Sequence, residues 1–280
     1  MADKQIYRFN NDIEAVEVTS IGAKIFIRPN TENEIYVEYE NPRDTPEFCA
    51  VLSGKTLTLK ENLSFSIFGV KPAEGYNITV LLPETTYARL KVNTASGGAQ
   101  IEGVRADSFD LNTASGDINV NAYFPEVKIQ SASGNVILNN PTDYIAKSVK
   151  TCTVSGTATI TGYKADQFSI HSVSGRTTYD AASGTGEISV TSGTVDVTYI
   201  AWQGDLNVSA ISGNVNLAFP ENAGLDITFN GMSGMVKTDI GNSKGNFMNL
   251  GKGTNGQFGG ENLHKLNVNL TSGIVTAAQA

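Results

Sequence analysis

The chain has 280 residues, of which 17% are charged and 40% apolar, and its formal net charge is −8. The apolar content suffices for a core and excludes wholesale disorder. No apolar run approaches the roughly 18 residues of a membrane-spanning helix, so no membrane span is expected. An acidic chain without a basic patch is also a poor candidate for binding nucleic acid or an anionic membrane.

The first part of the chain contains short alternating runs that are typical of β-strands. They lie at residues 13–18, 24–27, 35–39, 56–59 and 78–82, and turn residues separate them. The open end of a repeat array exposes unpaired backbone. We therefore expect residues 1–83 to form a β-rich cap region, continuous with the repeats that follow.

From residue 84 to residue 280 the sequence is a repeat marked by Ser-Gly. The intervals are 18 to 22 residues, except for a last interval of 39, which indicates a lost pair or an insertion. The nine pairs are Ser96 and Gly97, Ser115 and Gly116, Ser133 and Gly134, Ser155 and Gly156, Ser174 and Gly175, Ser192 and Gly193, Ser212 and Gly213, Ser233 and Gly234, and Ser272 and Gly273.

Apolar residues alternate with polar ones on both sides of each pair. Positions six and four before the serine, and three and five after it, are each apolar in eight of the nine repeats. A period of two is typical of strands, and the parity of the inward positions changes at Ser-Gly, which requires a corner there. We expect the glycine to supply a positive φ and the serine hydroxyl to bond the local backbone. These residues are then structural turn residues, with no catalytic, cofactor or metal role.

Stacked strand–corner–strand repeats predict an all-β fold, a right-handed β-solenoid with coils of about 20 residues. The hand follows from the usual hand of parallel crossovers. We expect residues 1–83 and 84–280 to form one structural unit. An antiparallel sandwich of short strands is the rival fold, and the unbroken serine register favours the solenoid.

The loops between coils suggest further local features. In the similar loops 103–109 and 162–168 we expect the glycine to end a strand and Asp107 and Asp166 to cap the turn. The glycine-rich stretch 239–264 is expected to be a flexible excursion. The last coil, 266–277, is then expected to leave an uncapped end that favours dimerisation.

Metal and redox chemistry has little support in the sequence. Cys49 and Cys152 form no CxxC motif, and His171 and His264 are the only histidines, so no zinc site is expected. A disulfide requires that the fold bring the two thiols together. Of the residues that follow the Ser-Gly pairs only Asp117 is acidic, unlike the calcium solenoids. No cofactor is expected.

The repeats resemble a known family. The segment Tyr76-Asn77-Ile78-Thr79-Val80-Leu81-Leu82-Pro83, followed by Leu-x-Val-x-Thr-x-Ser-Gly-x-Ile-x-Val coils, is similar to the bacterial "putative adhesin" domain family, also called toastrack. The best matching coil spans residues 109–120, and the resemblance covers about residues 13–277. It implies a non-enzymatic β-solenoid without catalytic residues to carry over, and the gene context of relatives implies scaffolding in envelope stress.

Three functions remain open. The first is an interaction scaffold that binds a protein partner or its own copy. The second is adhesion or carbohydrate binding, for which outward asparagines and loop aromatics are candidates: Asn93, Asn112, Asn119, Asn207, Asn214, Asn216, Asn267, Asn269, Tyr123, Tyr163, Tyr199 and Trp202. The third is a polysaccharide-active β-helix enzyme, which needs clustered acids; Asp107, Asp110 and Asp117 are close in sequence but occupy different parts of a coil.

The residues at the start of the sequence, Met1 to Gln5, lack the apolar core of a signal peptide. We therefore expect a cytoplasmic location, or an extracytoplasmic one if the chain is a trimmed form.

Overall fold

The computed structural model describes residues 3–41, 47–62, 76–240, 243–248, 254–260 and 263–280. Every regular element within these residues is a β-strand, which confirms the all-β class. The chain divides into two compact units, Met1–Pro141 and Thr142–Ala280, and each is described by itself.

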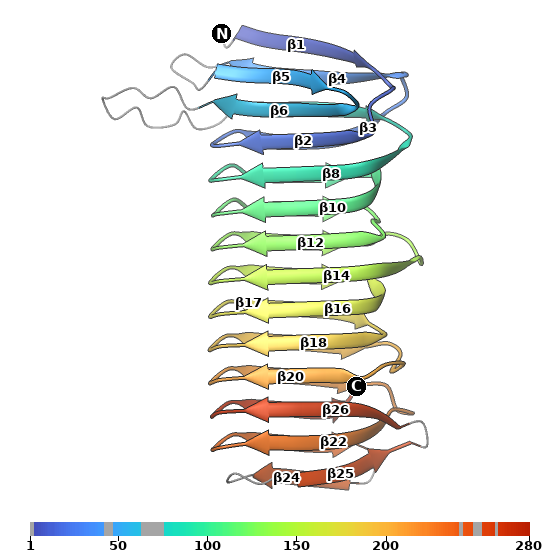
Figure 1. The fold of residues 1–280 in the computed structure, drawn as a ribbon, viewed down its shortest axis with the longest axis vertical. Helices are drawn as coiled ribbons and strands as arrows, with labels where there is room; N and C mark the ends of the chain where they lie inside the picture. Colours follow the sequence, from blue (N-terminus) through green and yellow to red (C-terminus); the bar gives the residue numbers. More distant parts are fainter. Residues whose placement is uncertain (1–2, 42–46, 63–75, 241–242, 249–253, 261–262) are drawn as a thin grey trace, which may run out of the picture. The chain divides into compact units, whose positions relative to one another are not determined.

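The first unit contains two sheets (Figure 1). One sheet has the strand order β1-β4-β7-β3-β9-β11-β13, and the other has the order β5-β6-β2-β8-β10-β12. The bounds are β1 Asp3–Asn10, β2 Ala15–Ser20, β3 Lys24–Asn30, β4 Glu34–Asn41, β5 Glu47–Ser53, β6 Thr56–Asn62, β7 Asn77–Pro83, β8 Thr86–Thr94, β9 Ala99–Glu102, β10 Arg105–Thr113, β11 Ile118–Asn121, β12 Glu126–Ser131 and β13 Asn135–Asn139.

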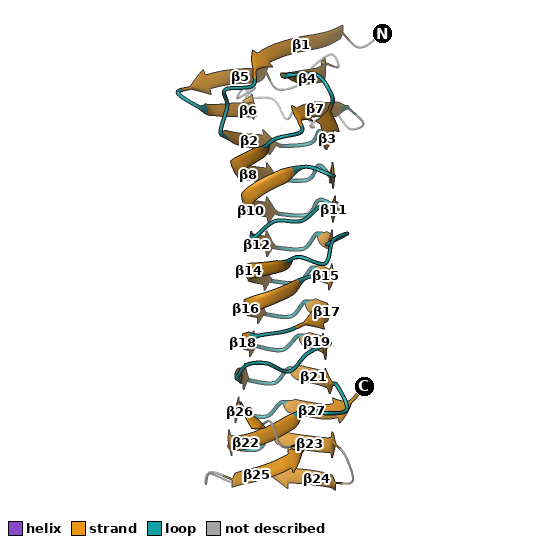
Figure 2. Ribbon diagram, turned by 90° about the vertical axis from the view of Figure 1, so that its right-hand side faces the viewer, coloured by secondary structure: helices purple, strands orange, loops and turns teal. Residues whose placement is uncertain are grey.

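The second unit repeats this two-sheet design (Figure 2). Its strand orders are β15-β17-β19-β21-β27-β23-β24 and β14-β16-β18-β20-β26-β22-β25. The bounds are β14 Ile145–Thr153, β15 Thr157–Thr161, β16 Lys164–Ser172, β17 Arg176–Ala182, β18 Thr185–Val190, β19 Thr194–Tyr199, β20 Leu206–Ala210, β21 Asn214–Phe219, β22 Gly224–Gly231, β23 Met235–Ile240, β24 Ser243–Met248, β25 Thr254–Gly259, β26 Leu263–Leu270 and β27 Ile274–Gln279.

Each repeat places one strand in each sheet, with Ser-Gly at the corner between them. Neighbouring coils pair in parallel and in the register that the sequence predicts; Phe109, for example, lies between Leu90 and Val127. These inward residues are buried. Parallel pairing excludes the antiparallel sandwich and confirms the solenoid, while its hand stays a prediction.

Among the inward residues six positions before the corner serine, Gly186 is the one glycine, and packing explains it. In the coil before it, the ring of Phe168 occupies the space that a side chain at Gly186 would need. Phe168 also packs edge-on against Tyr179, with 5.3 Å between ring centroids. A large side chain and a small one in adjacent coils thus fill one volume, as close packing requires.

The C-terminal coil does not lie at the end of its unit, contrary to the expectation from sequence. β26 pairs in parallel with β20 on one side and with β22 on the other, and β27 likewise lies between β21 and β23. The outermost strands are β24 and β25, which pair antiparallel to β23 and β22. They come from the stretch 239–264, so its described part is not the expected flexible excursion but strands that cover the coil edge.

The N-terminal part has the same kind of exchange. β2 and β3 pair in parallel with β8 and β9, although β4 to β7 intervene in the chain. β6 and β7 lie next to β2 and β3, and β4 and β5 add antiparallel strands outside them. The boundary at residue 83 between cap and repeats stays a prediction.

Two smaller expectations have different outcomes. Gly103 and Gly162 have φ values of 63° and 71° and follow β9 and β15, so glycine ends these strands as expected. Asp107 and Asp166 do not cap turns, since they lie within β10 and β16.

The thiols of Cys49 and Cys152 form no disulfide and belong to different units.

Candidate functional site

The corner serines connect neighbouring coils. Ser115 Oγ donates to the carbonyl of Ala95 at 3.1 Å, and Ser133 Oγ donates to the carbonyl of Ala114 at 2.9 Å. Ser96, Ser192, Ser212, Ser233 and Ser272 make the equivalent bond at 2.8–3.2 Å. The acceptor therefore belongs to the adjacent coil. The sequence-based expectation of a bond within the serine's own turn was wrong for these serines.

The corner glycines are needed for close approach and not for positive φ. None of the glycines in the nine repeat pairs is among the positive-φ residues. A Cβ on Gly116 would lie 2.8 Å from the carbonyl carbon of Gly97 and would collide with its oxygen. Glycines 97, 134, 175, 193 and 273 meet a carbonyl of the neighbouring coil in the same way. The expectation of a positive φ was therefore wrong. Glycine is needed at these positions because the carbonyl of the neighbouring coil leaves no room for a Cβ.

A buried acid ends this corner ladder in the first unit. Glu61 on β6 is only 5% exposed, and its Oε2 accepts bonds from Ser20 Oγ at 3.0 Å and from the backbone N–H of Ile21 at 2.5 Å. In later coils the groups equivalent to the Ile21 N–H bond a corner carbonyl. Burial raises the pKa of Tyr76, and nearby Glu61 raises it further. Glu61 therefore acts as a structural cap of the corner ladder, a role that no pattern in the sequence indicates.

The exposed side of the corners carries no charge. In each coil the serine and the residue before it are exposed or half-buried, while the glycine is buried. In the second unit the residues before the serines are, in spatial order, Val154, Val173, Thr191, Ile211, Thr271 and Met232. We call these six the second-unit corner edge. Val154, Ile211 and Met232 are 45%, 55% and 71% exposed.

The outward asparagines bond mainly to one another and to neighbouring polar side chains. Asn112 Nδ2 donates to Asn93 Oδ1 at 2.9 Å, and Asn267 Nδ2 donates to Asn207 Oδ1 at 2.9 Å. Asn216 donates to Asp196. Asp196 in turn accepts from Arg176 at 2.6 Å. These side chains stabilise the stacking of coils, and much of their hydrogen-bonding capacity is already used.

The aromatic candidates for a sugar platform are mostly in the core. Tyr163 and Tyr199 are buried, and Trp202 is 7% exposed and donates its Nε1–H to the carbonyl of Gly224. Trp202 packs edge-on against Tyr199 and His264. Burial raises the pKa of Tyr199 well above its usual value. Only Tyr123 is half-buried, so three of the four aromatic candidates pack in the core, where they cannot form a binding platform.

The acids that an enzyme would need do not converge within the described residues. Asp110 bonds Arg89 at 2.5 Å, and Asp117 accepts from Asn135 at 3.0 Å. No group of three or more acid, histidine or cysteine side chains is placed to hold a metal in that part of the chain.

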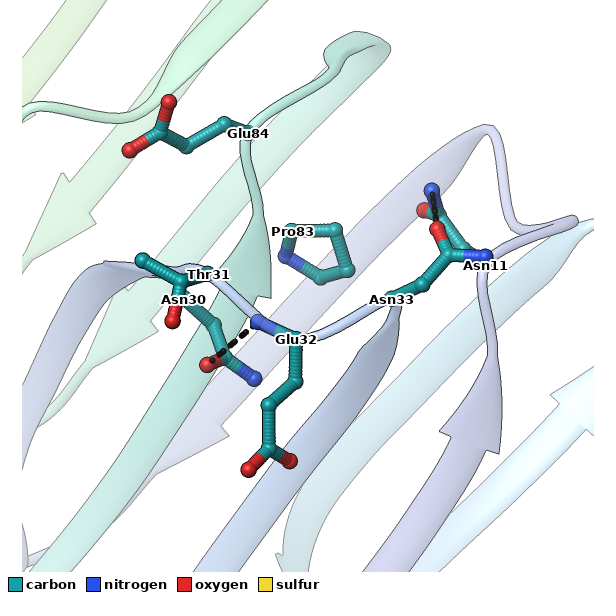
Figure 3. Close-up of a pocket in the computed structure, with 7 residues that line it drawn as sticks. All are labelled: Asn11, Asn30, Thr31, Glu32, Asn33, Pro83 and Glu84. Carbon is teal, nitrogen blue, oxygen red and sulfur yellow. Dashed lines mark hydrogen bonds between the residues drawn. The ribbon is translucent and has the colours of Figure 1, made fainter.

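One open pocket lies at the turns of the first unit (Figure 3). Its volume is about 350 Å³. Asn33 Oδ1 accepts from Asn11 Nδ2 at 3.0 Å, and Asn30 Oδ1 accepts from the backbone N–H of Glu32 at 3.1 Å. The buried Asn11 Oδ1 has no hydrogen-bond partner among the described atoms. The other lining residues are Thr31, Pro83 and Glu84.

The pocket was not found from the sequence. Its residues lie in the β1–β2, β3–β4 and β7–β8 connections or end the strands β3 and β7, and the exchanged strand order brings them together. Runs such as Asn30-Thr31-Glu32-Asn33 look like ordinary turns, so the only signal was their richness in amides.

Comparison with known proteins identifies the family. The family model described as Toastrack DUF4097 matches residues 13–278, and the chain belongs to this family, as the repeat pattern had indicated. A similar solved structure is a putative lipid binding protein from Parabacteroides distasonis ATCC 8503, with 15% identity, a TM-score of 0.59, and 98% of this chain and 96% of that chain covered. No curated protein matches the sequence.

Two further solved structures cover nearly the whole chain. A putative adhesin from Bacteroides fragilis NCTC 9343 has 11% identity and a TM-score of 0.46, with 99% of this chain and 97% of that chain covered. A putative adhesin from Parabacteroides distasonis ATCC 8503 has 12% identity and the same TM-score and coverage. Within the described residues, no helix has the length and apolar character to cross a bilayer.

Proposed function

We propose that this chain is a non-enzymatic interaction scaffold that binds a protein partner along the second-unit corner edge. The observation that carries the proposal is the chemistry of this edge. Its six residues are uncharged, and Val154, Ile211 and Met232 expose large apolar side chains. Adjacent strands are about 4.8 Å apart, so the edge presents a regular strip of apolar and threonine side chains.

The desolvation cost of covering this strip is small. The exposed serine hydroxyls beside it, at positions 192, 212, 233 and 272, already donate to backbone carbonyls. Burying a polar group without a partner is costly, whereas burying a satisfied one is much less so. A flat, apolar protein surface is therefore the ligand that this edge favours. This proposal includes a cytoplasmic location. It also includes the scaffolding role in envelope stress that the family resemblance implies.

The test compares charge insertions at matched exposed sites. Ile211→Lys places a charge in the middle of the corner edge, while Ile137→Lys places one at an apolar site on β13 of similar exposure. Native complexes are crosslinked in cells and purified with each variant. We expect Ile211→Lys to lose the partners that the wild type and Ile137→Lys retain. Equal recovery with all three would overturn the proposal.

A second candidate function is carbohydrate binding in the pocket of Figure 3. The observation that favours it is a pocket lining rich in oxygen acceptors, the amides of Asn11, Asn30 and Asn33 and the carboxylates of Glu32 and Glu84. Sugar hydroxyls can donate to such an acceptor. A glycan-binding screen with the wild type and Asn33→Ala tests it, with Asn112→Ala as a control on the outward ladder. Binding that Asn33→Ala leaves unchanged would exclude the pocket.

A further inference from the structure

The strand β5 ends its sheet with an open backbone edge. It pairs antiparallel with β6 and, in the strand order of the described residues, with no other strand. Tyr7 of β1 packs against Phe48 near the start of β5, with 5.8 Å between ring centroids. Toward the end of the strand Val51 and Leu52 are 54% and 46% exposed. Consecutive strand residues point to opposite faces, so this part of β5 is uncovered on both faces.

β5 lacks the protection that edge strands usually carry. Residues 48–53 are Phe-Cys-Ala-Val-Leu-Ser, without charge, proline or glycine. β1, the last strand of the other sheet in this unit, contains Lys4 and Arg8, which pair with Glu38 and Glu34. Charged residues on an edge strand oppose the addition of another strand, and an apolar, uncharged edge invites it.

We propose that a second copy of this chain pairs with β5, antiparallel and across a twofold axis centred on Val51. An open row of N–H and C=O groups is satisfied best by another extended strand. In this register Val51 faces its own copy, Ala50 faces Leu52 of the second copy, and no like charges are opposed. A twofold contact closes on itself and yields a dimer rather than a fibre.

The same register argument disfavours β1 as the contact. Antiparallel pairing of β1 with its copy about Ile6 would place Lys4 opposite Arg8 of the second copy, and like charges directly opposite each other are destabilising. In the second unit β25 has the sequence Thr-Asn-Gly-Gln-Phe-Gly, and its two glycines weaken it as a strand partner. The C-terminal coil that the sequence favoured for dimerisation is enclosed between other coils.

Sedimentation equilibrium of the purified full chain is the first test. We expect twice the 29.7 kDa chain mass for the wild type at high micromolar concentration. Val51→Lys places two lysines opposite each other at the twofold axis. We therefore expect this variant to have the mass of a single chain. Ile137→Lys, at an apolar site of similar exposure in the same unit, should remain a dimer. A monomeric wild type at hundreds of micromolar, or a dimer that Val51→Lys leaves intact, would overturn the proposal.

A crosslink provides a second readout that does not depend on disruption. Opposed residues of antiparallel strands have Cα atoms about 4.5–5.5 Å apart, within the range of a disulfide. Val51→Cys, in a chain with Cys49→Ser and Cys152→Ser, should oxidise rapidly to a covalent dimer, while Ile137→Cys in the same background should not. Equal crosslinking at the two sites would contradict the register. Circular dichroism checks that each variant folds. Partner binding is tested separately with Ile211→Lys, so the dimer and the proposed function can fail independently.

Discussion

Replacing Gly116 by alanine tests the corner ladder at its closest contact. The added Cβ would lie 2.8 Å from the carbonyl carbon of Gly97, whereas nonbonded carbons prefer about 3.5–4.0 Å. Two coils must therefore separate by roughly an ångström at the corner. This movement weakens the bonds from Ser115 N to Ala95 O at 2.9 Å and from Ala99 N to Asp117 O at 3.0 Å.

The expected cost follows from these changes. Two backbone hydrogen bonds contribute about 1 kcal/mol each, and overpacking costs about 1–3 kcal/mol more. Alanine returns about 0.4–1 kcal/mol by restricting the unfolded chain. The free energy of unfolding should therefore fall by about 3 kcal/mol.

Ala23 provides a matched control. Its carbonyl accepts the Ser20 hydroxyl as the carbonyl of Gly97 accepts that of Thr94, so it occupies the glycine position of the coil formed by β2 and β3. Ala23→Gly adds no contact and should cost only about 1–2 kcal/mol, from one buried methyl group and chain entropy.

Urea unfolding followed by circular dichroism, with hydrogen exchange at each coil, measures both variants, since repeat arrays do not always unfold in one step. A loss below about 1 kcal/mol for Gly116→Ala would refute the steric account of the corner.

Three further predictions concern the cap, the buried tyrosines and the enclosed coil. Glu61→Ala leaves the Ile21 N–H without its acceptor, while the Ser20 hydroxyl keeps the carbonyl of Ala23, so β2 amides should exchange faster and stability should fall by about 1–3 kcal/mol. The exposed Lys60→Ala should change stability by no more than about 0.5 kcal/mol, and equal effects of the two variants would contradict the capping role. Burial raises the pKa of Tyr87 to about 12, so its stabilising contribution is complete below the unfolded value of about 10 and is lost as pH rises from there toward 12. Urea unfolding near pH 9 and pH 11 should show lower stability at the higher pH, and unchanged stability would contradict the burial. Amides of β26 and β27 should exchange more slowly than those of β24 and β25, because a coil lies on either side of them; exchange at the same rate would contradict the enclosed position.

The sequence predicts the coils well because each inward position repeats. Leu90, Phe109 and Val127 fall in one column of the alignment and lie side by side in β8, β10 and β12. The corner serine fixes the phase of both strands, so fold class and register follow from one motif.

The order of the coils could not be predicted for the same reason. Leu266 fits equally well beside Leu206 or Ile227, and in the structure it pairs with both. A periodic column specifies that coils stack but not which coil lies next to which. The enclosed C-terminal coil, and the edge strand β5 left open in the first unit, are therefore visible only in three dimensions.

The candidate sites show a similar limit. An alternating pattern marks which side chains point outward, but not whether they are satisfied there. Asn112 was a reasonable ligand candidate until its amide was seen to bond Asn93. Trp202 occurs in a loop, which favours exposure, yet Gly224 and Tyr199 enclose it.

The most direct test of the interaction role is site-specific photocrosslinking in cells. A photoreactive amino acid is placed at Ile211 on the second-unit corner edge, at Ile137 on β13, or at Asn33 in the pocket. The proposed function predicts a discrete protein adduct from position 211 that positions 137 and 33 do not give. Adducts of equal yield from all three positions, or none from position 211, would contradict it.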